Sequence, residues 1–232
     1  MIDWHSHILP GMDDGSKDVA ESIAMLQMQA AQGVKTVIAT PHFYANDEKV
    51  ASFVERRAKA LEALKAQLPE DAPGILLGAE VRYYQGISRM EDLMDLRIEG
   101  SKLLLLEMPM AVWTEYMIRE LVELSGRSRV RIVLAHVERY LRLQKQSVWE
   151  RLADSGILMQ INGNFVTSLT TKRKAIALLA EGSVQFLGSD CHNLTTRSPQ
   201  LGKAFEVIRK KLGDDYLDQM NHYGYSLFAA TN

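Results

Sequence analysis

Seven short apolar runs alternate with longer amphipathic stretches along the whole chain, and this alternation is the strongest constraint on the fold. It is typical of repeated strand–helix units built around a parallel sheet. Most of the runs are almost continuously apolar, as expected for strands that are covered on both faces. The runs are Met1–Trp4, Val34–Ala39, Ile75–Val81, Leu103–Leu106, Val130–Ala135, Ile157–Ile161 and Val184–Leu187.

The stretches between the runs have helical spacing. In the first, Ser16 is a suitable N-cap, apolar side chains recur every three or four residues, and Gly33 ends the helix. The second helix is expected from about Asp47 and is closed by Pro69. Further helices are predicted near residues 113–125, 146–155, 170–181 and 199–211, with short helical turns beyond residue 214.

A chain of 232 residues is long enough to bury a sizeable core within one α/β domain. No linker or internal repeat divides the sequence, so we expect a single domain over residues 1–232. Seven strand–helix units favour a distorted TIM-like barrel, a (β/α)7 barrel. An open, flavodoxin-like sheet is the alternative.

Charge and cysteine content exclude several classes of function. Lys and Arg number 27 against 29 Asp and Glu, so the sequence gives no sign of a basic surface for nucleic acid. The apolar runs fall far short of the ~20 residues that cross a bilayer, and the polar start differs from a signal peptide, so we expect a cytoplasmic protein without membrane insertion. The single cysteine, Cys191, cannot form an intramolecular disulfide.

Histidines and carboxylates lie near the end of six of the seven runs or directly after it, at the points where strands should end. In a strand–helix barrel, the carboxyl ends of the strands meet on the face that carries the chemistry. Five of the six histidines and three carboxylates occupy such positions, whereas the remaining histidine lies in a tyrosine-rich tail and is taken as structural. The strand-end residues are His5, His7, His42, Glu80, Glu107, His136, Asp190 and His192.

Any one of these residues alone would more often cap a helix or bond to the backbone. His5 and His7 are more informative as a pair, because alternate residues of a strand point the same way. Glu80 and Glu107 could form ion pairs in the core, but carboxylates in a barrel mouth are costly to desolvate unless cations are present. Imidazole and carboxylate donors without thiolate suit Zn, Mn or Fe, and so many donors indicate several ions.

The loop over residues 8–15 contains Asp13 and Asp14 among Pro-Gly and Asp-Gly turn formers. A surface turn is the simplest interpretation of this loop. Because the loop follows His5 and His7, one of its carboxylates could also reach over the barrel mouth and complete another metal site.

Taken together, the motifs resemble the polymerase and histidinol phosphatase (PHP) superfamily, and within it the bacterial metal-dependent protein-tyrosine phosphatases of capsule and exopolysaccharide loci. The resemblance spans residues 2 to about 199. Trp4 and Cys191 depart from the usual pattern, but neither occupies a ligand position. The motifs are H-S-H-I-L-P-G-M-D-D-G (5–15), T-P-H (40–42), G-A-E (78–80), E-M-P (107–109), H-V-E-R-Y (136–140) and S-D-C-H-N (189–193).

The resemblance implies a distorted barrel of the PHP type that holds three divalent ions, most often Mn²⁺, with Fe or Zn as alternatives. The implied ligand sets are His5, His7, Glu80 and Asp190 for one ion, Glu80, Glu107 and His136 for the second, and Asp14, His42 and His192 for the third. Arg139 and Arg197 would hold the phosphate, and a hydroxide between metals would attack it. Asp13 is a candidate proton donor or partner of a ligand, although a role in the turn is at least as compatible with the sequence.

The resemblance further implies hydrolysis of phosphotyrosine, with the tyrosine-rich tail of a bacterial tyrosine kinase as protein substrate. Three divalent ions and four carboxylates leave a net charge of about +2, which suits a phosphomonoester dianion. A phenol of pKa ~10 leaves more readily than an alkoxide, so phosphotyrosine is chemically easier than phosphoserine. Four aromatic residues could form an apolar rim around the substrate, or they could be residues of the core and of helix starts. They are Tyr83, Tyr84, Trp113 and Tyr116.

Three other functions stay open. A phosphatase for a small ester such as histidinol phosphate, or a phosphodiesterase, would share the metal core. Cys191 and Arg197 fit the C-x5-R loop of cysteine-dependent tyrosine phosphatases, but no glycine lies between them to turn amides toward a phosphate, and Asp190 would raise the thiol pKa. A non-catalytic metal-binding regulator would hold metal without hydrolysis. The sequence gives no indication of oligomeric state.

Overall fold

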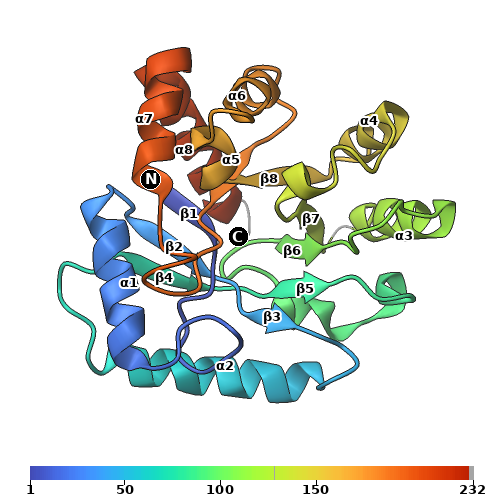
Figure 1. Cartoon of the computed structure of the whole chain (residues 1–232). Coiled ribbons are helices and arrows are strands. Elements are labelled where there is room, and N and C mark those ends of the chain that lie inside the picture. The colour runs from blue at the N-terminus through green and yellow to red at the C-terminus, as the bar shows by residue number, and fades with distance from the viewer. Residues whose placement is uncertain (128, 230–232) are drawn as a thin grey trace.

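The structure, a computed structural model, describes residues 1–127 and 129–229, and its strands form curled parallel sheets (Figure 1). One sheet has the order β1-β2-β4, and the other has the order β3-β5-β6-β7-β8-β9. Every strand pair is parallel. The strands are β1 Ile2–Ser6, β2 Thr36–Ala39, β3 His42–Phe43, β4 Gly74–Leu77, β5 Glu80–Arg82, β6 Leu103–Glu107, β7 Arg131–Leu134, β8 Leu158–Asn162 and β9 Phe186–Gly188.

The two sheets are connected at both of their junctions. Gly78 N donates to Ala39 O (2.8 Å) and Glu80 N donates to Pro41 O (3.0 Å), so the pairing of β2 with β4 continues into the pairing of β3 with β5 where β2 leads into β3 and β4 leads into β5. At the other end, the segment after β9 lies beside β1, where His7 N donates to Cys191 O (2.9 Å) and Asp190 N donates to His5 O (2.8 Å). The carboxyl ends of β1 and β9 are thereby brought together.

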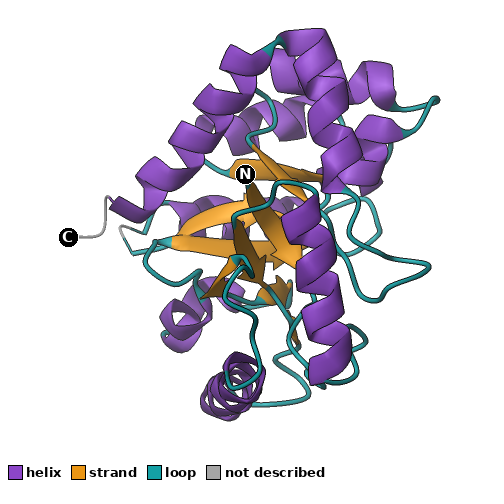
Figure 2. Cartoon of the chain, turned by 90° about the vertical axis from the view of Figure 1, so that its left-hand side faces the viewer, coloured by secondary structure: helices purple, strands orange, loops and turns teal. Residues whose placement is uncertain are grey.

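Helices surround the strands (Figures 1 and 2). They cover the outward side chains of the sheet, such as Leu104 and Leu106 of β6, which belong to the larger apolar cluster. Three short 3₁₀ turns cover residues 87–89, 92–96 and 137–139. The helices are α1 Val19–Ala31, α2 Val50–Lys65, α3 Glu115–Ser125, α4 Gln146–Asp154, α5 Gly163–Thr167, α6 Lys172–Ala180, α7 Leu201–Leu212 and α8 Asp214–Ala229. None of the described helices is long and apolar enough to cross a bilayer.

A second apolar cluster contains alternate residues of the strands, such as Leu103 and Leu105 of β6, and α8 packs against it. Trp4 stacks on Phe186 with ring centroids 3.9 Å apart, and Phe228 of α8 stacks on Trp4 at 5.7 Å. Short turns were expected after residue 214, and the 16-residue helix α8 corrects that prediction. The helix forms there because its aromatic side chains have this apolar cluster to pack against.

Other boundaries also differ from the sequence prediction. Asp18, not Ser16, caps α1, because its carboxylate accepts the N–H of Glu21 (2.8 Å). Helix α2 begins at Val50 and ends at Lys65, inside the predicted limits. The run Ile75–Val81 forms two strands, β4 and β5, and β3 and α5 were not predicted at all. Strand β3 has only two residues, which is too short for a periodic signal.

We expect Gly188→Ala to destabilise the fold and to disturb His5, because an added Cβ would lie 2.5 Å from the Cβ of His5 and 2.8 Å from Nε2 of Gln160. Overpacking of this kind typically costs about 1–3 kcal/mol. Urea unfolding followed by tryptophan fluorescence measures the change. Gly126→Ala is the matched control, because its nearest new contacts would be an ordinary 3.5 and 3.6 Å. Equal urea midpoints for the two variants would contradict this close approach.

Candidate metal centre

The nine residues in the implied ligand sets come together at the carboxyl ends of the strands. Their donor atoms form groups in which all members lie within 4.8 Å of one another. The loop after β1 brings in Asp14, and the other eight residues lie in a strand or within a few residues of its carboxyl end. The groups are His7–Asp14–His42–His192, His5–His7–Asp190, His5–Glu80–His136 and His42–Glu80–Glu107.

Glu80 lies at the centre of this cluster and is 1% exposed. Its Oε2 is 3.1 Å from Nε2 of His5, 3.3 Å from Nε2 of His7 and 3.0 Å from Nδ1 of His42. Its Oε1 is 2.9 Å from Nε2 of His136. A single buried carboxylate therefore lies against four imidazoles that come from three other strands or their ends.

Three buried polar atoms in the cluster lack a hydrogen-bond partner: Glu80 Oε2, His42 Nδ1 and His192 Nε2. The first two are 3.0 Å apart but do not meet in hydrogen-bond geometry. Buried polar atoms normally have partners, because leaving them unpaired costs free energy. Imidazole nitrogen and carboxylate oxygen are metal donors, so the residues present fit a metal centre.

The titration of the cluster shows how strongly its groups interact. Burial disfavours the protonated form of His7, yet the hydrogen bond to Asp13 and the nearby negative charges of Asp13 and Glu80 prevail and raise the pKa of His7 to about 10. Burial likewise opposes ionisation of Glu80, but the imidazoles around it hold the pKa of this carboxyl well below its ordinary value. Positive charge among the imidazoles thus stabilises the buried carboxylate. Divalent cations bound here would supply the same positive charge.

Two of the cluster residues have a left-handed backbone conformation that non-glycine residues seldom adopt. His136 has φ 34° and Asp190 has φ 52°, and each follows the end of a strand, β7 and β9 respectively. Such conformations cost about 1–3 kcal/mol each and gather at functional sites. The strained turns therefore support a functional role for the cluster.

Strand β8 contributes two residues that the sequence interpretation missed. Oε1 of Gln160 lies 3.2 Å from Nδ1 of His5 and accepts the backbone N–H of His136 (2.8 Å). Asn162 donates from Nδ2 to Oδ2 of Asp190 (2.9 Å). The available signal was a polar residue at two alternate positions of an otherwise apolar run, which places both side chains on the same face.

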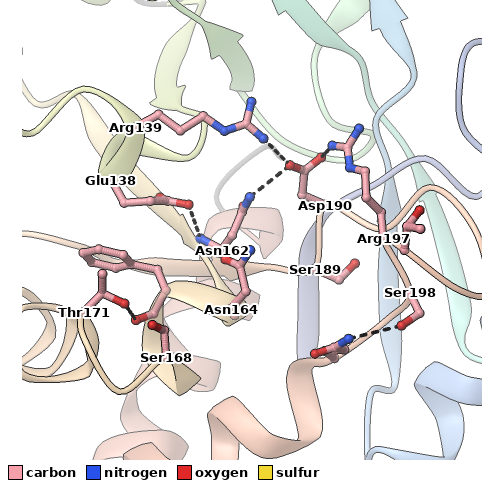
Figure 3. Close-up of a pocket in the computed structure, with 14 residues that line it drawn as sticks. Glu138, Arg139, Asn162, Asn164, Ser168, Thr171, Ser189, Asp190, Arg197 and Ser198 are labelled. Carbon is pink, nitrogen blue, oxygen red and sulfur yellow. Dashed lines mark hydrogen bonds and ion pairs between the residues drawn. The ribbon is translucent and has the colours of Figure 1, made fainter.

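Arg139 and Arg197 both bind Asp190 at the edge of the cluster (Figure 3). Their guanidinium groups donate to Oδ2 (2.7 Å) and Oδ1 (2.8 Å) of that carboxylate. Arg82, which was not predicted, donates to Oε2 of Glu107 (2.9 Å). Each of the three arginines is partly exposed, so this edge presents forked donors of the kind that bind oxyanions.

The loop after β1 is both a turn and a source of donors. Asp13 accepts the backbone N–H of Gly15 (2.9 Å) and of His42 (2.8 Å), and its Oδ2 lies 2.7 Å from Nδ1 of His7. Asp14 is 64% exposed, with Oδ1 3.3 Å from Nε2 of His192. These contacts place Asp13 where it orients His7, and Asp14 where it reaches the cluster from the solvent side.

The aromatic residues proposed as a rim are mostly inside the protein. Trp113 is 4% exposed and packs against Trp149 and Tyr140. The hydroxyl groups of Tyr83 and Tyr84 contact Glu120 and the sulfur of Met90, and both rings pack against the core. Only Tyr116, at 38% exposure, is on the surface. The core interpretation is therefore correct for Trp113 and holds in part for the half-buried Tyr83 and Tyr84, whereas Tyr116 lies in the first turn of α3, as the helix-start interpretation expects.

Cys191 is fully buried, and burial strongly raises the pKa of its thiol, with Asp3 acting in the same direction. Arg197 faces Asp190 and not the sulfur. The thiol therefore has neither the exposure nor the cationic surroundings of a nucleophilic thiolate, which argues against the C-x5-R interpretation.

The fold and the site define an α/β protein with a curled parallel sheet and a cluster of imidazole and carboxylate donors at its carboxyl edge. A family model described as capsular polysaccharide synthesis, CpsB/CapC, matches residues 1–224, and the chain belongs to this family.

Curated relatives carry the name tyrosine-protein phosphatase. YwqE of Bacillus subtilis is 33% identical over 223 residues, covering 93% of this chain and 86% of the relative. CpsB of Streptococcus pneumoniae is 32% identical, covering 92% and 91%. A crystal structure from a study of these two proteins, described there as unique metal-dependent tyrosine phosphatases, superposes with a TM-score of 0.81 at 28% identity, covering 100% of this chain and 96% of the other.

We expect Cys191 of the native protein to resist iodoacetamide at neutral pH and to react once urea exposes it, because burial and a raised pKa keep the sulfur protonated. Mass spectrometry of the alkylated peptide measures both states. Rapid labelling of the native protein would instead show an accessible thiolate and would return the cysteine mechanism to consideration.

Proposed function

We propose that the chain is a metal-dependent phosphatase that hydrolyses phosphotyrosine in proteins. The main support is the buried carboxylate of Glu80 among four imidazoles, with Arg139 and Arg197 at the edge of the same cluster. The names of the curated relatives and the description of the solved structure support the same reaction.

The proposal includes a distorted (β/α)7 barrel of the PHP type with three divalent ions, Mn²⁺ first and Fe or Zn as alternatives. The bonds between the segment after β9 and β1 support closure of the strands into such a barrel. Two of the donor groups support the implied ligand sets: His7–Asp14–His42–His192 contains the whole third set, and His5–His7–Asp190 lies within the first. Glu80 would bridge two ions, because its two oxygens face different imidazoles.

When bound, the ions would lower the pKa of water to give a hydroxide at neutral pH and would offset charge on the phosphoryl oxygens. Arg139 and Arg197 would orient the phosphate through forked N–H donors. Asp13 would act by holding His7, and Gln160 by fixing His5 and the turn at His136. The leaving phenolate needs little help from an acid, so a role for Asp13 as proton donor is secondary.

The proposed substrate is a phosphotyrosine-containing protein, with the tyrosine-rich tail of a bacterial tyrosine kinase as the specific candidate. The capsular polysaccharide family and the tyrosine-phosphatase names of the relatives support a phosphotyrosine protein in capsule regulation. A cytoplasmic location is part of the proposal, because ATP-dependent kinases form phosphotyrosine in that compartment.

Removal of metal should abolish hydrolysis of p-nitrophenyl phosphate. Glu80→Gln should lower the metal content of the purified protein and should lower kcat by roughly 100-fold or more, a larger loss than is usual when a residue that only supports a metal ligand is changed. Elemental analysis and a colorimetric assay measure the two quantities. Glu150→Gln is the matched control, since this carboxylate is exposed on α4, away from the cluster. Full activity after chelation and dialysis would refute the metal mechanism.

For the substrate, we expect kcat/KM for a phosphotyrosyl peptide to exceed that for histidinol phosphate and for the matching phosphoserine peptide by at least about tenfold, because the phenolate leaves more readily and a peptide makes more contacts. Phosphate release measures all three rates under the same metal loading. A preference for histidinol phosphate would assign the chain to small-ester chemistry.

A further inference from the structure

A groove of about 540 Å³ opens beside the two arginines and extends away from the donor cluster (Figure 3). Glu138 and Arg139 form one side of it, and Arg197 and Ser198 form the facing side. Residues 162–165, where β8 leads into α5, also line the groove. The groove is therefore continuous with the proposed phosphate site but reaches well beyond it.

The lining of the groove is largely polar, with Phe165 as its one large apolar side chain, and its formal charges balance. Arg139 and Arg197 are balanced by Glu138 and Asp190, and both arginines already bind Asp190. The remaining polar groups are neutral amides and hydroxyls that can donate and accept hydrogen bonds, as the groups of a peptide backbone do. They belong to Asn162, Asn164, Ser168, Thr171, Ser189, Thr196, Ser198 and Gln200.

Two exposed apolar residues lie on segments whose neighbouring residues line the groove. Leu169, which is 91% exposed, lies between the lining residues Ser168 and Thr171. Leu194, which is 37% exposed, is on the loop that supplies Thr196 to the lining. A single exposed leucine is ordinary, but two leucines on segments that line the same groove offer apolar surface to a chain bound there.

Exposed apolar residues gather on this end of the molecule. Among the described residues, six of the seven large exposed apolar side chains lie on segments that follow the carboxyl end of a strand, where the donor cluster also lies. The exception is Tyr225 of α8. The six are Tyr44, Met110, Val112, Tyr116, Leu169 and Leu194.

We propose that the groove binds the polypeptide segment next to the phosphotyrosine of the substrate, and that apolar side chains of this segment pack against Leu169 and Leu194. The inference rests on the proposed function and deepens it by naming what else the enzyme recognises. A small phosphate ester would reach the arginines and the donor cluster only, and would gain nothing from leucines outside them. An extended peptide matches both the neutral polar lining and the two exposed leucines.

The test uses Leu169→Asp, an exposed change on a loop that carries none of the proposed metal donors. The probes are p-nitrophenyl phosphate and two phosphotyrosyl pentapeptides, one with leucines and one with alanines beside the phosphotyrosine. We expect the wild type to show a lower KM for the leucine peptide and Leu169→Asp to raise that KM by about tenfold, an effect of the size expected for losing most of one leucine contact. The KM and kcat for p-nitrophenyl phosphate should stay as in the wild type.

Binding is measured separately from turnover, by fluorescence anisotropy with the same leucine peptide carrying a non-hydrolysable phosphonate on tyrosine. The matched control is Tyr225→Asp, which places the same charge on the exposed apolar residue outside this end. Val112→Asp tests whether the substrate segment instead runs over the loop after β6, which carries this exposed residue.

Weaker peptide binding in Leu169→Asp alone supports the groove. Three binding results overturn it: equal binding of the two peptides by the wild type, equal losses in Leu169→Asp and Tyr225→Asp, or a loss confined to Val112→Asp. A parallel fall in p-nitrophenyl phosphate hydrolysis would mean that Leu169 acts on the reaction itself, which also overturns the inference. Absence of hydrolysis in every metal-loaded sample would refute the proposed function, whereas the anisotropy comparison would still decide on the groove.

Discussion

The contact of one buried carboxylate, Glu80, with four imidazoles is the interaction on which the rest of the structure depends. Desolvating a carboxylate costs several kcal/mol, and that cost is offset only when positive charge is held close to it. The imidazoles lie in β1 or directly after it, in β3 and in the turn after β7, so the fold must bring all of these segments to one level. The parallel pairing His42↔Glu80 achieves this for β3 and β5, and the break before β5 lets Glu80 face inward.

The donor residues could be predicted because a parallel sheet converts a position at the end of a strand into a position in space. His5, His42 and Asp190 are far apart in sequence, yet each follows an apolar run, and that was sufficient to place them together. The supporting residues Gln160 and Asn162 could not be recognised in the same way. Gln160 lies within an apolar run that has no histidine or acid at its end, and Asn162 directly follows that run. Only the folded sheet shows that they hold His5, His136 and Asp190.

Elements that depend on tertiary contacts were the ones missed. Strand β3 exists because it pairs with β5, and two residues carry no pattern of their own. Helix α8 has a mixed sequence, and packing of its aromatic side chains on the cluster around Trp4 stabilises it. The strained turns at His136 and Asp190 were also missed, because they too depend on tertiary contacts. Asp190 is held by Arg139, Arg197 and Asn162, contacts that compensate for its left-handed backbone and that no local sequence signal reveals.

One end of the curled sheet carries an apolar cluster and the other carries polar and charged groups, so the residues that stabilise the fold lie apart from those proposed to recognise the substrate. Below the donors, strand side chains, Trp4 and α8 form an apolar cluster that excludes water. Above the donors, the loops carry the arginines, the polar groove and most of the exposed apolar side chains. Because Leu169 lies on a loop that supplies no metal donor, its side chain can change without moving Glu80 or His136. Substrate recognition can therefore diverge among related chains while the buried donor cluster stays the same.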